Sequence, residues 1–167
     1  MKETIAFMTG SFDPITNGHL SIIERVSQLY DKVVIGLFEN PNKKYWWTMS
    51  ERKQLVQQAV QHLSNVEIID CPHELVMDAA QRIGATVIVK GLRNQTDFVY
   101  ETTPTIVHYE QAQLETVYLL AEPKYQHISS SLVRELALFN GPYQAYVPSH
   151  VAQAIKIKVK EYKDEKK

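Results

Sequence analysis

The sequence predicts a single α/β domain built on a doubly wound, five-stranded parallel sheet. Apolar runs typical of buried strands alternate with helical patterns along the whole chain, and the connections between them are short. The chain has 167 residues, of which 44% are hydrophobic and 22% charged, which suits one globular domain with a substantial core. We expect the domain to span residues 1–160 and a charged tail to occupy residues 161–167.

The first three elements follow from hydrophobic periodicity. Ile5–Met8 is a short apolar run and is the first expected strand. Gly18–Leu29 places apolar residues at helical spacing, which predicts an amphipathic helix. Lys32–Phe38 is a near-continuous apolar run of the kind that is buried on both faces of a parallel sheet.

The next elements carry clear end signals. Thr48–Glu51 has the pattern of a capping box and opens a helix expected to reach about Leu63. Val66–Asp70 is the third expected strand. Glu74–Ile83 is a helical segment, and Gly84 is expected to stop it because glycine readily adopts the left-handed conformation that ends helices.

The fourth expected strand is Thr86–Lys90. We expect Asp97 to cap the helix after it, and Pro104 should shorten or kink that helix because proline lacks an N–H donor and its ring crowds the preceding turn. Glu115–Leu120 is the fifth expected strand. With five strands joined by helices, the predicted architecture is Rossmann-like.

Two helices are expected to complete the chain. The run Tyr125–Ser131 opens the first of them, which reaches Phe139 and is closed by Asn140–Gly141. The last helix starts near Pro148 and is expected to fray into the charged residues from Lys160 onward.

The turn between the first strand and the first helix, Thr9–His19, carries the clearest chemical signal. Two glycines bracket it, Ser11 supplies a hydroxyl, and Asn17 or Gly18 can adopt unusual φ/ψ angles. His19 falls in the first helical turn, where unpaired N–H groups and the positive end of the helix dipole favour an anion. The turn therefore predicts a phosphate site, and an ordinary Asn-Gly turn with a helix-capping histidine is the less favoured alternative.

Cations and hydroxyls also follow the other strands. Ligands of open parallel sheets collect beyond the carboxyl ends of the strands, where the loops carry His19, Lys43, Lys90, Arg93 and the serines 129–131. A solvated surface pair is the alternative for Lys43 and its neighbour Lys44. The sequence has neither a Gly-x-Gly fingerprint nor a P-loop, and its histidines and cysteine lack metal-ligand spacing.

Composition excludes several classes of protein. The net charge of −1 argues against a general nucleic-acid binder. The single cysteine, Cys71, excludes an internal disulfide framework. No segment approaches the roughly 20 apolar residues of a membrane span. We therefore expect a cytoplasmic protein that binds neither nucleic acid nor membrane.

Residues Gly10–His19 resemble the signature turn of the nucleotidyltransferase superfamily, and the resemblance to the bacterial phosphopantetheine adenylyltransferase family covers nearly the whole chain. It implies transfer of AMP from ATP to 4′-phosphopantetheine, giving dephospho-coenzyme A and pyrophosphate. It also implies Mg²⁺ held mainly through the ATP phosphates, and a homohexamer. An enzyme with another acceptor, such as nicotinate mononucleotide or glycerol 3-phosphate, and a nucleotide-binding regulator without turnover are the alternatives.

The resemblance assigns roles residue by residue. His19 and Lys43 match the residues that stabilise the transition state, and Ser11 matches the one that contacts both substrates. The ATP-binding set it implies is Ser11, Phe12, His19, Gly91, Leu92, Arg93, Glu101, Tyr125, Gln126, His127, Ile128, Ser129, Ser130 and Ser131. The phosphopantetheine set is Ser11, Lys43, Val76 and Lys90, and no residue is expected to ligate a metal.

The chain departs from the family pattern at three places. Thr9 stands where the family usually has proline. Lys90 stands where it usually has arginine, which keeps the charge but loses the two-pronged guanidinium fork. Thr102–Glu110 replaces a helix that contains Met and Asn and helps to line the pantetheine pocket. Within that stretch we expect His108 and Tyr109 to pack or to face solvent.

Overall fold

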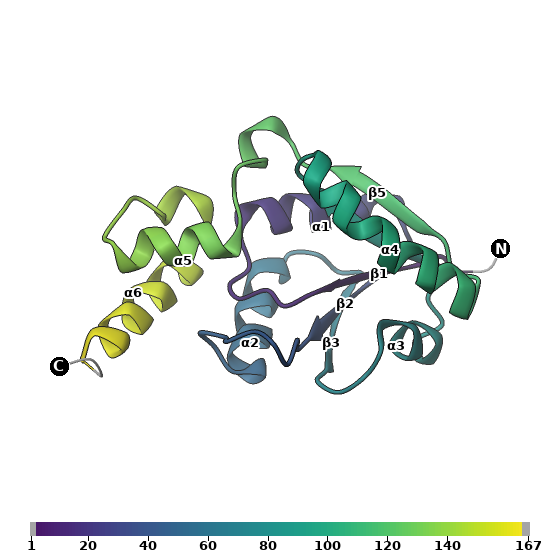
Figure 1. Ribbon diagram of the computed structural model, residues 1–167, viewed down its shortest axis with the longest axis horizontal. Coiled ribbons are helices and arrows are strands. Elements are labelled where there is room, and N and C mark those ends of the chain that lie inside the picture. The colour runs from purple at the N-terminus through teal and green to yellow at the C-terminus, as the bar shows by residue number, and fades with distance from the viewer. Residues whose placement is uncertain (1–2, 165–167) are drawn as a thin grey trace.

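The computed structural model describes residues 3–164, and within them five strands form one sheet in which every neighbouring pair runs parallel (Figure 1). The strand order is β3-β2-β1-β4-β5, which confirms the predicted Rossmann-like, doubly wound arrangement. The strands are β1 (Ile5–Gly10), β2 (Lys32–Phe38), β3 (Val66–Cys71), β4 (Val87–Leu92) and β5 (Thr116–Leu120).

The helices cover both faces of this sheet. They are α1 (Asn17–Leu29), α2 (Met49–Val60), α3 (Val76–Arg82), α4 (Gln95–Ala112), α5 (Ser130–Leu138) and α6 (Ser149–Asp164), with short 3-10 turns at Pro123–Tyr125 and Gln144–Tyr146. Figure 1 shows α5 and α6 side by side beyond one end of the sheet. None of the helices within residues 3–164 is long and apolar enough to cross a membrane.

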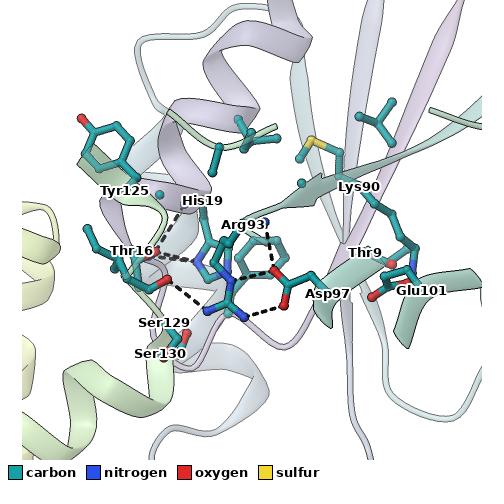
Figure 2. Close-up of a pocket in the computed structure, with 18 of the residues that line it drawn as sticks. Thr9, Thr16, His19, Lys90, Arg93, Asp97, Glu101, Tyr125, Ser129 and Ser130 are labelled. Atoms are coloured by element: carbon teal, nitrogen blue, oxygen red, sulfur yellow. Dashed lines mark hydrogen bonds and ion pairs between the residues drawn. The ribbon is translucent and has the colours of Figure 1, made fainter. Parts of the chain in front are cut away.

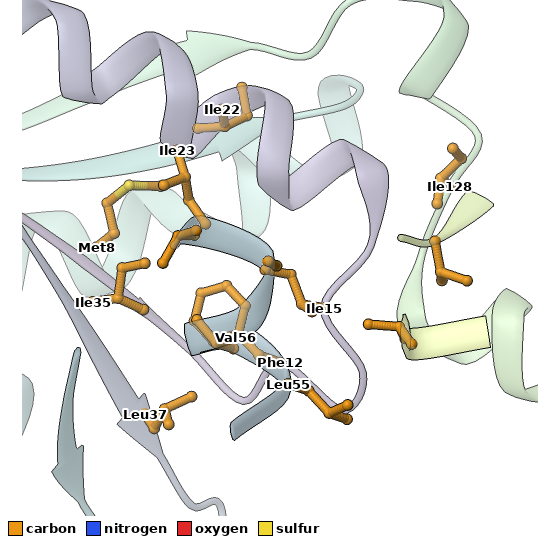
Figure 3. Close-up of a cluster of buried hydrophobic side chains, with 14 of the residues drawn as sticks. Met8, Phe12, Ile15, Ile22, Ile23, Ile35, Leu37, Leu55, Val56 and Ile128 are labelled. Atoms are coloured by element: carbon orange, nitrogen blue, oxygen red, sulfur yellow. The ribbon is translucent and has the colours of Figure 1, made fainter. Parts of the chain in front are cut away.

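The core alternates across the sheet as the pleat requires. Along β1, Ala6 and Met8 belong to the larger apolar cluster, which α1, α2, α5 and α6 complete, and Figure 3 shows part of this cluster. Phe7, between them, belongs to a smaller cluster on the opposite face, to which α3 contributes Met77. Both faces are therefore buried, as the apolar strands predict.

Helix α4 departs from the prediction at both its start and its middle. Its N-cap is Asn94, whose side chain accepts a hydrogen bond from the N–H of Asp97, so the expectation that Asp97 is the cap is wrong. Pro104 lies inside the helix and does not end it. The hydroxyl of Tyr118 on β5 donates to the carbonyl of Glu101 at 3.4 Å, so hydrogen bonds from a neighbouring strand support the turn that the proline weakens.

Three local predictions are also corrected. The left-handed residue of the Thr9–His19 turn is Phe12, at φ 48°, and not Asn17 or Gly18. Helix α2 ends at Val60, before the predicted Leu63. Helix α6 continues through Asp164, so the chain does not fray at Lys160, and residues 165–167 of the expected tail lie outside the described residues.

Candidate active site

Two cavities meet at the carboxyl ends of β1 and β4, the point where the strand order of the sheet reverses. Each has a volume of about 460 Å³, and they share Phe12, His19 and Ser130. The first cavity, drawn in Figure 2, also contains the predicted residues Lys90, Gly91, Arg93, Glu101, Tyr125, Ile128 and Ser129. The second contains Ser11, Lys43 and Ser131. The independent sequence stretches therefore converge, as strand direction predicts.

His19 lies where the two cavities join, and its tautomer follows from its contacts. The backbone N–H of Thr16 donates to Nδ1 at 3.1 Å, in a capping box that opens α1 (Figure 2). Because a backbone N–H can only donate, Nδ1 accepts and the neutral ring carries its proton on Nε2. Burial, helped by the positive charge of Arg93, lowers the pKa of His19 from 6.5 to about 4. At neutral pH the ring is therefore an uncharged N–H donor.

This lowered pKa predicts a pH-dependent stability. Between pH 6.5 and about 4, His19 is protonated in the unfolded chain but stays neutral in the folded chain. The free energy of unfolding should therefore fall as the pH falls. The full contribution is roughly 3 kcal/mol. Urea denaturation of the wild type and of His19→Gln across this range should give a difference that shrinks toward low pH. A constant difference would contradict the assignment.

Arg93 and Asp97 form a rigid pair in the wall of the first cavity. The guanidinium donates to both carboxylate oxygens at 2.9 Å, and its Nη1 donates to the carbonyl of Ile128 at 3.2 Å (Figure 2). The hydrogen bonds from Arg93 lower the pKa of Asp97. Arg93 thus joins the loop after β4 to the run before α5, and its fork is held in place before any ligand binds.

Lys90 and Glu101 are also paired in the first cavity. Lys90 Nζ lies 2.5 Å from Glu101 Oε2, and the two side chains are 15% and 23% exposed. Both residues were predicted for substrate binding, but their mutual neutralisation was not predicted. A phosphate that binds Lys90 must therefore share the ammonium with Glu101 or displace it.

The second cavity is rich in cations. Lys43, Lys44 and Arg134 line it together with Ser11, and both lysines are exposed. Arg134 donates to the backbone carbonyl of Asp13 and lies 3.3 Å from its carboxylate. With Arg134 paired to Asp13, the two exposed lysines and the hydroxyls make this cavity a suitable place for a polyphosphate.

The N-termini of two helices also face the joined cavities. Ser129 caps α5 by accepting from the N–H of Leu132, and Ser130 donates to the carbonyl of Pro14 at 2.8 Å, tying α5 to the Thr9–His19 turn. Helix α1 begins beside His19. Both helix dipoles therefore add positive potential where an anion would bind.

The side chains that the structure describes form no ready-made metal site. Within residues 3–164 no group of three or more His, Cys, Asp or Glu side chains is placed to hold a metal ion. The carboxylates nearest the cavities are already paired: Asp97 with Arg93, Glu101 with Lys90, and Asp13 with Arg134. This donor set fits a magnesium ion that arrives on phosphate oxygens and keeps its waters.

Comparison with known proteins agrees with this geometry. A model of the cytidylyltransferase-like family matches residues 7–136. A phosphopantetheine adenylyltransferase from Streptococcus gordonii is 46% identical over 93% of this chain and 95% of its own length. One from Streptococcus pneumoniae is 44% identical over 93% of this chain and 97% of its own length. This chain belongs to the phosphopantetheine adenylyltransferase family.

Solved structures show that the family fold extends to distant adenylyltransferases. A Vibrio parahaemolyticus structure described as a nicotinate-nucleotide adenylyltransferase superposes with a TM-score of 0.67 at 17% identity, covering 95% of each chain. A bifunctional NMN adenylyltransferase/ADP ribose pyrophosphatase from Francisella tularensis gives a TM-score of 0.61 at 16% identity. The match covers 87% of this chain and 44% of the Francisella chain. At these identities the likeness concerns the fold alone.

Four residues that the family pattern selects lie outside both cavities. Leu92 is buried, Gln126 donates to the carbonyl of Ala121, and the ring of His127 packs against Tyr146. Val76 begins α3 and packs against the smaller core cluster. Residues 102–110, where the chain departs most from the family, also lie outside the lining of both cavities.

The fold also brings to the site residues that were not predicted to belong to it. Asp97 and Tyr100 line the first cavity, and Asp13 and Arg134 line the second. Arg134 had a readable signal, since it stands four residues after Ser130 and so shares its face of α5. Asp13 had none, because its partners come from distant loops.

Proposed function

We propose that this member of the phosphopantetheine adenylyltransferase family transfers AMP from ATP to 4′-phosphopantetheine at the join of the two cavities. An oxygen of the pantetheine phosphate attacks the α-phosphorus of ATP. The bond from that phosphorus to the α,β-bridging oxygen breaks, giving dephospho-coenzyme A and pyrophosphate. The observation that carries the proposal is the position of His19, which lines a nucleotide-sized cavity and a cationic cavity at once.

The chemistry asks for alignment and charge stabilisation. A phosphate nucleophile is already ionised at neutral pH, so no general base is required. Nε2–H of His19 donates to the α-phosphate as negative charge develops, and its neutral ring, which the Thr16 contact and the lowered pKa support, adds no charge of its own. Lys43 and Ser11, across the second cavity, stabilise the same charge and the departing pyrophosphate.

The remaining predicted residues would hold the substrates. Arg93 and Glu101 form the ATP wall together with Tyr125, Ile128, Ser129 and Ser130, and Lys90 serves the acceptor phosphate or the triphosphate. Magnesium would enter on the phosphate oxygens and offset part of the triphosphate charge. We place the enzyme in the cytoplasm, which the free, buried thiol of Cys71 supports.

Pyrophosphate release tests the proposal. The purified protein is incubated with ATP and magnesium, with and without 4′-phosphopantetheine, and the product is identified by mass. Acceptor-dependent release with dephospho-coenzyme A is expected. Nicotinate mononucleotide and glycerol 3-phosphate serve as competing acceptors, and adenylylation of either one instead would overturn the substrate assignment. ATP binding with no release in any mixture would favour a nucleotide-binding regulator.

We also propose that the protein assembles as a homohexamer, as its family resemblance implies. The face formed by α4 and β5 supports this, because Val99, Tyr100, Ile106 and Leu120 are each more than half exposed there. Ile106→Glu should lower the mass measured by light scattering, since it puts a charge on that face. Gln54→Glu on α2, exposed elsewhere, is the control and should leave the mass unchanged. A wild-type monomer would contradict the proposal.

A further inference from the structure

A buried arginine outside the lining of both cavities connects the two loops that carry the catalytic side chains. Arg52 lies in the first turns of α2, and its side chain is fully buried. Figure 3 shows its neighbours Leu55 and Val56 packed around Phe12 in the larger core cluster. A guanidinium in such a place is costly to bury, and apolar side chains of similar size often serve stability as well or better.

The partners of Arg52 show what the charge does there. Its Nη1 donates to the carbonyl of Ser11 at 2.7 Å and to that of Phe38 at 3.3 Å. Its Nη2 donates to the carboxylate of Glu39 at 2.8 Å, and the guanidinium stacks on the ring of Tyr45, 4.4 Å from its centroid. The first partner belongs to the Thr9–His19 turn, Phe38 is the last residue of β2, and Glu39 and Tyr45 belong to the loop between β2 and α2.

The bond to Ser11 fixes the direction of a peptide group at the join of the cavities. In a trans peptide the C=O and the following N–H point in opposite directions. Because the Ser11 carbonyl points into the core toward Arg52, the Phe12 N–H points the other way. Phe12 holds φ at 48°, a left-handed conformation that is rare for a bulky residue and that persists where surrounding contacts enforce it.

The bonds to the second loop position Lys43. Phe38 and Glu39 precede this lysine and Tyr45 follows it. Arg52 therefore contacts the chain on both sides of the exposed Lys43 side chain. Asn40 N–H donates to the Tyr45 hydroxyl at 2.6 Å, which closes the loop on itself. One guanidinium thus fixes the backbone of the turn before His19 and the start of the loop that carries Lys43.

We propose that Arg52 is a positioning residue for adenylyl transfer: its guanidinium aligns the Ser11–Phe12 peptide and the Lys43 loop around the reacting phosphates. The inference rests on the proposed function. It predicts that neutralising Arg52 lowers kcat more than it raises the KM for ATP, since ATP binds mainly to the walls of the first cavity.

The test uses Arg52→Met, Arg52→Lys and the matched control Arg82→Met, whose arginine is a half-exposed surface partner of Glu74. Thermal unfolding followed by circular dichroism accompanies kcat and KM. We expect Arg52→Met to remain folded with kcat about 100-fold lower. Arg52→Lys, which keeps the charge but not the fork, should fall between it and the wild type. Arg82→Met should match the wild type.

A double-mutant cycle separates positioning from general destabilisation. If Arg52 acts partly through Lys43, adding Arg52→Met to Lys43→Ala should cost less than adding it to the wild type. A folded Arg52→Met with wild-type kcat would overturn the inference, as would fully additive losses. If Arg52→Met does not fold, a folded Arg52→Lys with wild-type kcat overturns it instead. An inactive wild type would mean that the proposed function itself has failed.

Discussion

His19→Ala should reduce kcat by about 100- to 1,000-fold, while the dissociation constant for ATP changes little. The variant removes the neutral N–H donor at the join of the two cavities. The corresponding loss of transition-state stabilisation is about 3 to 4 kcal/mol, by analogy with the removal of an oxyanion-hole donor. Pyrophosphate release measures kcat, and titration calorimetry measures ATP binding.

Two further variants isolate this effect. His19→Gln keeps a side chain whose amide oxygen can complete the capping box with Thr16, so it should fold well. An amide held in that bond is not free to aim its NH2 as the ring aims Nε2–H, so kcat should still fall. His62→Ala removes a half-exposed histidine paired with Glu24 and should leave kcat unchanged. Turnover by His19→Ala near the wild-type rate would refute the mechanism proposed for this site.

Asp13→Ala should lower the free energy of unfolding by about 3 kcal/mol, which is a large part of the stability of a small domain. The Asp13 side chain is 4% exposed and accepts from the backbone N–H groups of Trp46 and Trp47. It also pairs with Arg134 at 3.3 Å. Its removal leaves two N–H donors without their acceptor and takes the carboxylate from a partly buried cation, which keeps only its bond to the backbone carbonyl of residue 13.

Urea denaturation measures this loss through the transition midpoint and its slope. Asp13→Asn keeps one acceptor oxygen for the tryptophan N–H groups and should be less destabilised than Asp13→Ala. Asp70→Ala, which removes an exposed partner of Lys53, should stay within about 1 kcal/mol of the wild type. If Asp13→Ala were as stable as Asp70→Ala, Asp13 would not hold these loops together.

The sequence predicted the fold well because strands and helices leave local signals. Lys32–Phe38 was predicted to the residue, and the Thr48–Glu51 capping box is present. Pro104 misled the prediction because proline is a strong local helix breaker, whereas the contacts that support α4 come from β5. Local propensity yields when tertiary contacts compensate for it.

The site was predicted in part for the same reason. His19 could be found because strand, turn and helix start are adjacent in the sequence. The pairing of Lys90 with Glu101 and the burial of Arg52 could not, because each depends on side chains that meet only in the folded chain. Family resemblance selected residues that contact the cavities, but it gave no account of what holds them in place.

The two cavities share only a few side chains. Substitutions far from these side chains should therefore have little effect on the reaction. Residues 102–110 depart most from the family pattern and line neither cavity, whereas Phe12, His19 and Ser130 line both. Substitutions at residues 102–110 can therefore spare the reacting atoms while they alter the exposed face of α4 that is proposed for assembly. A reporter dye or an affinity handle attached there would spare both cavities, but at Ile106 it would block the face proposed for assembly.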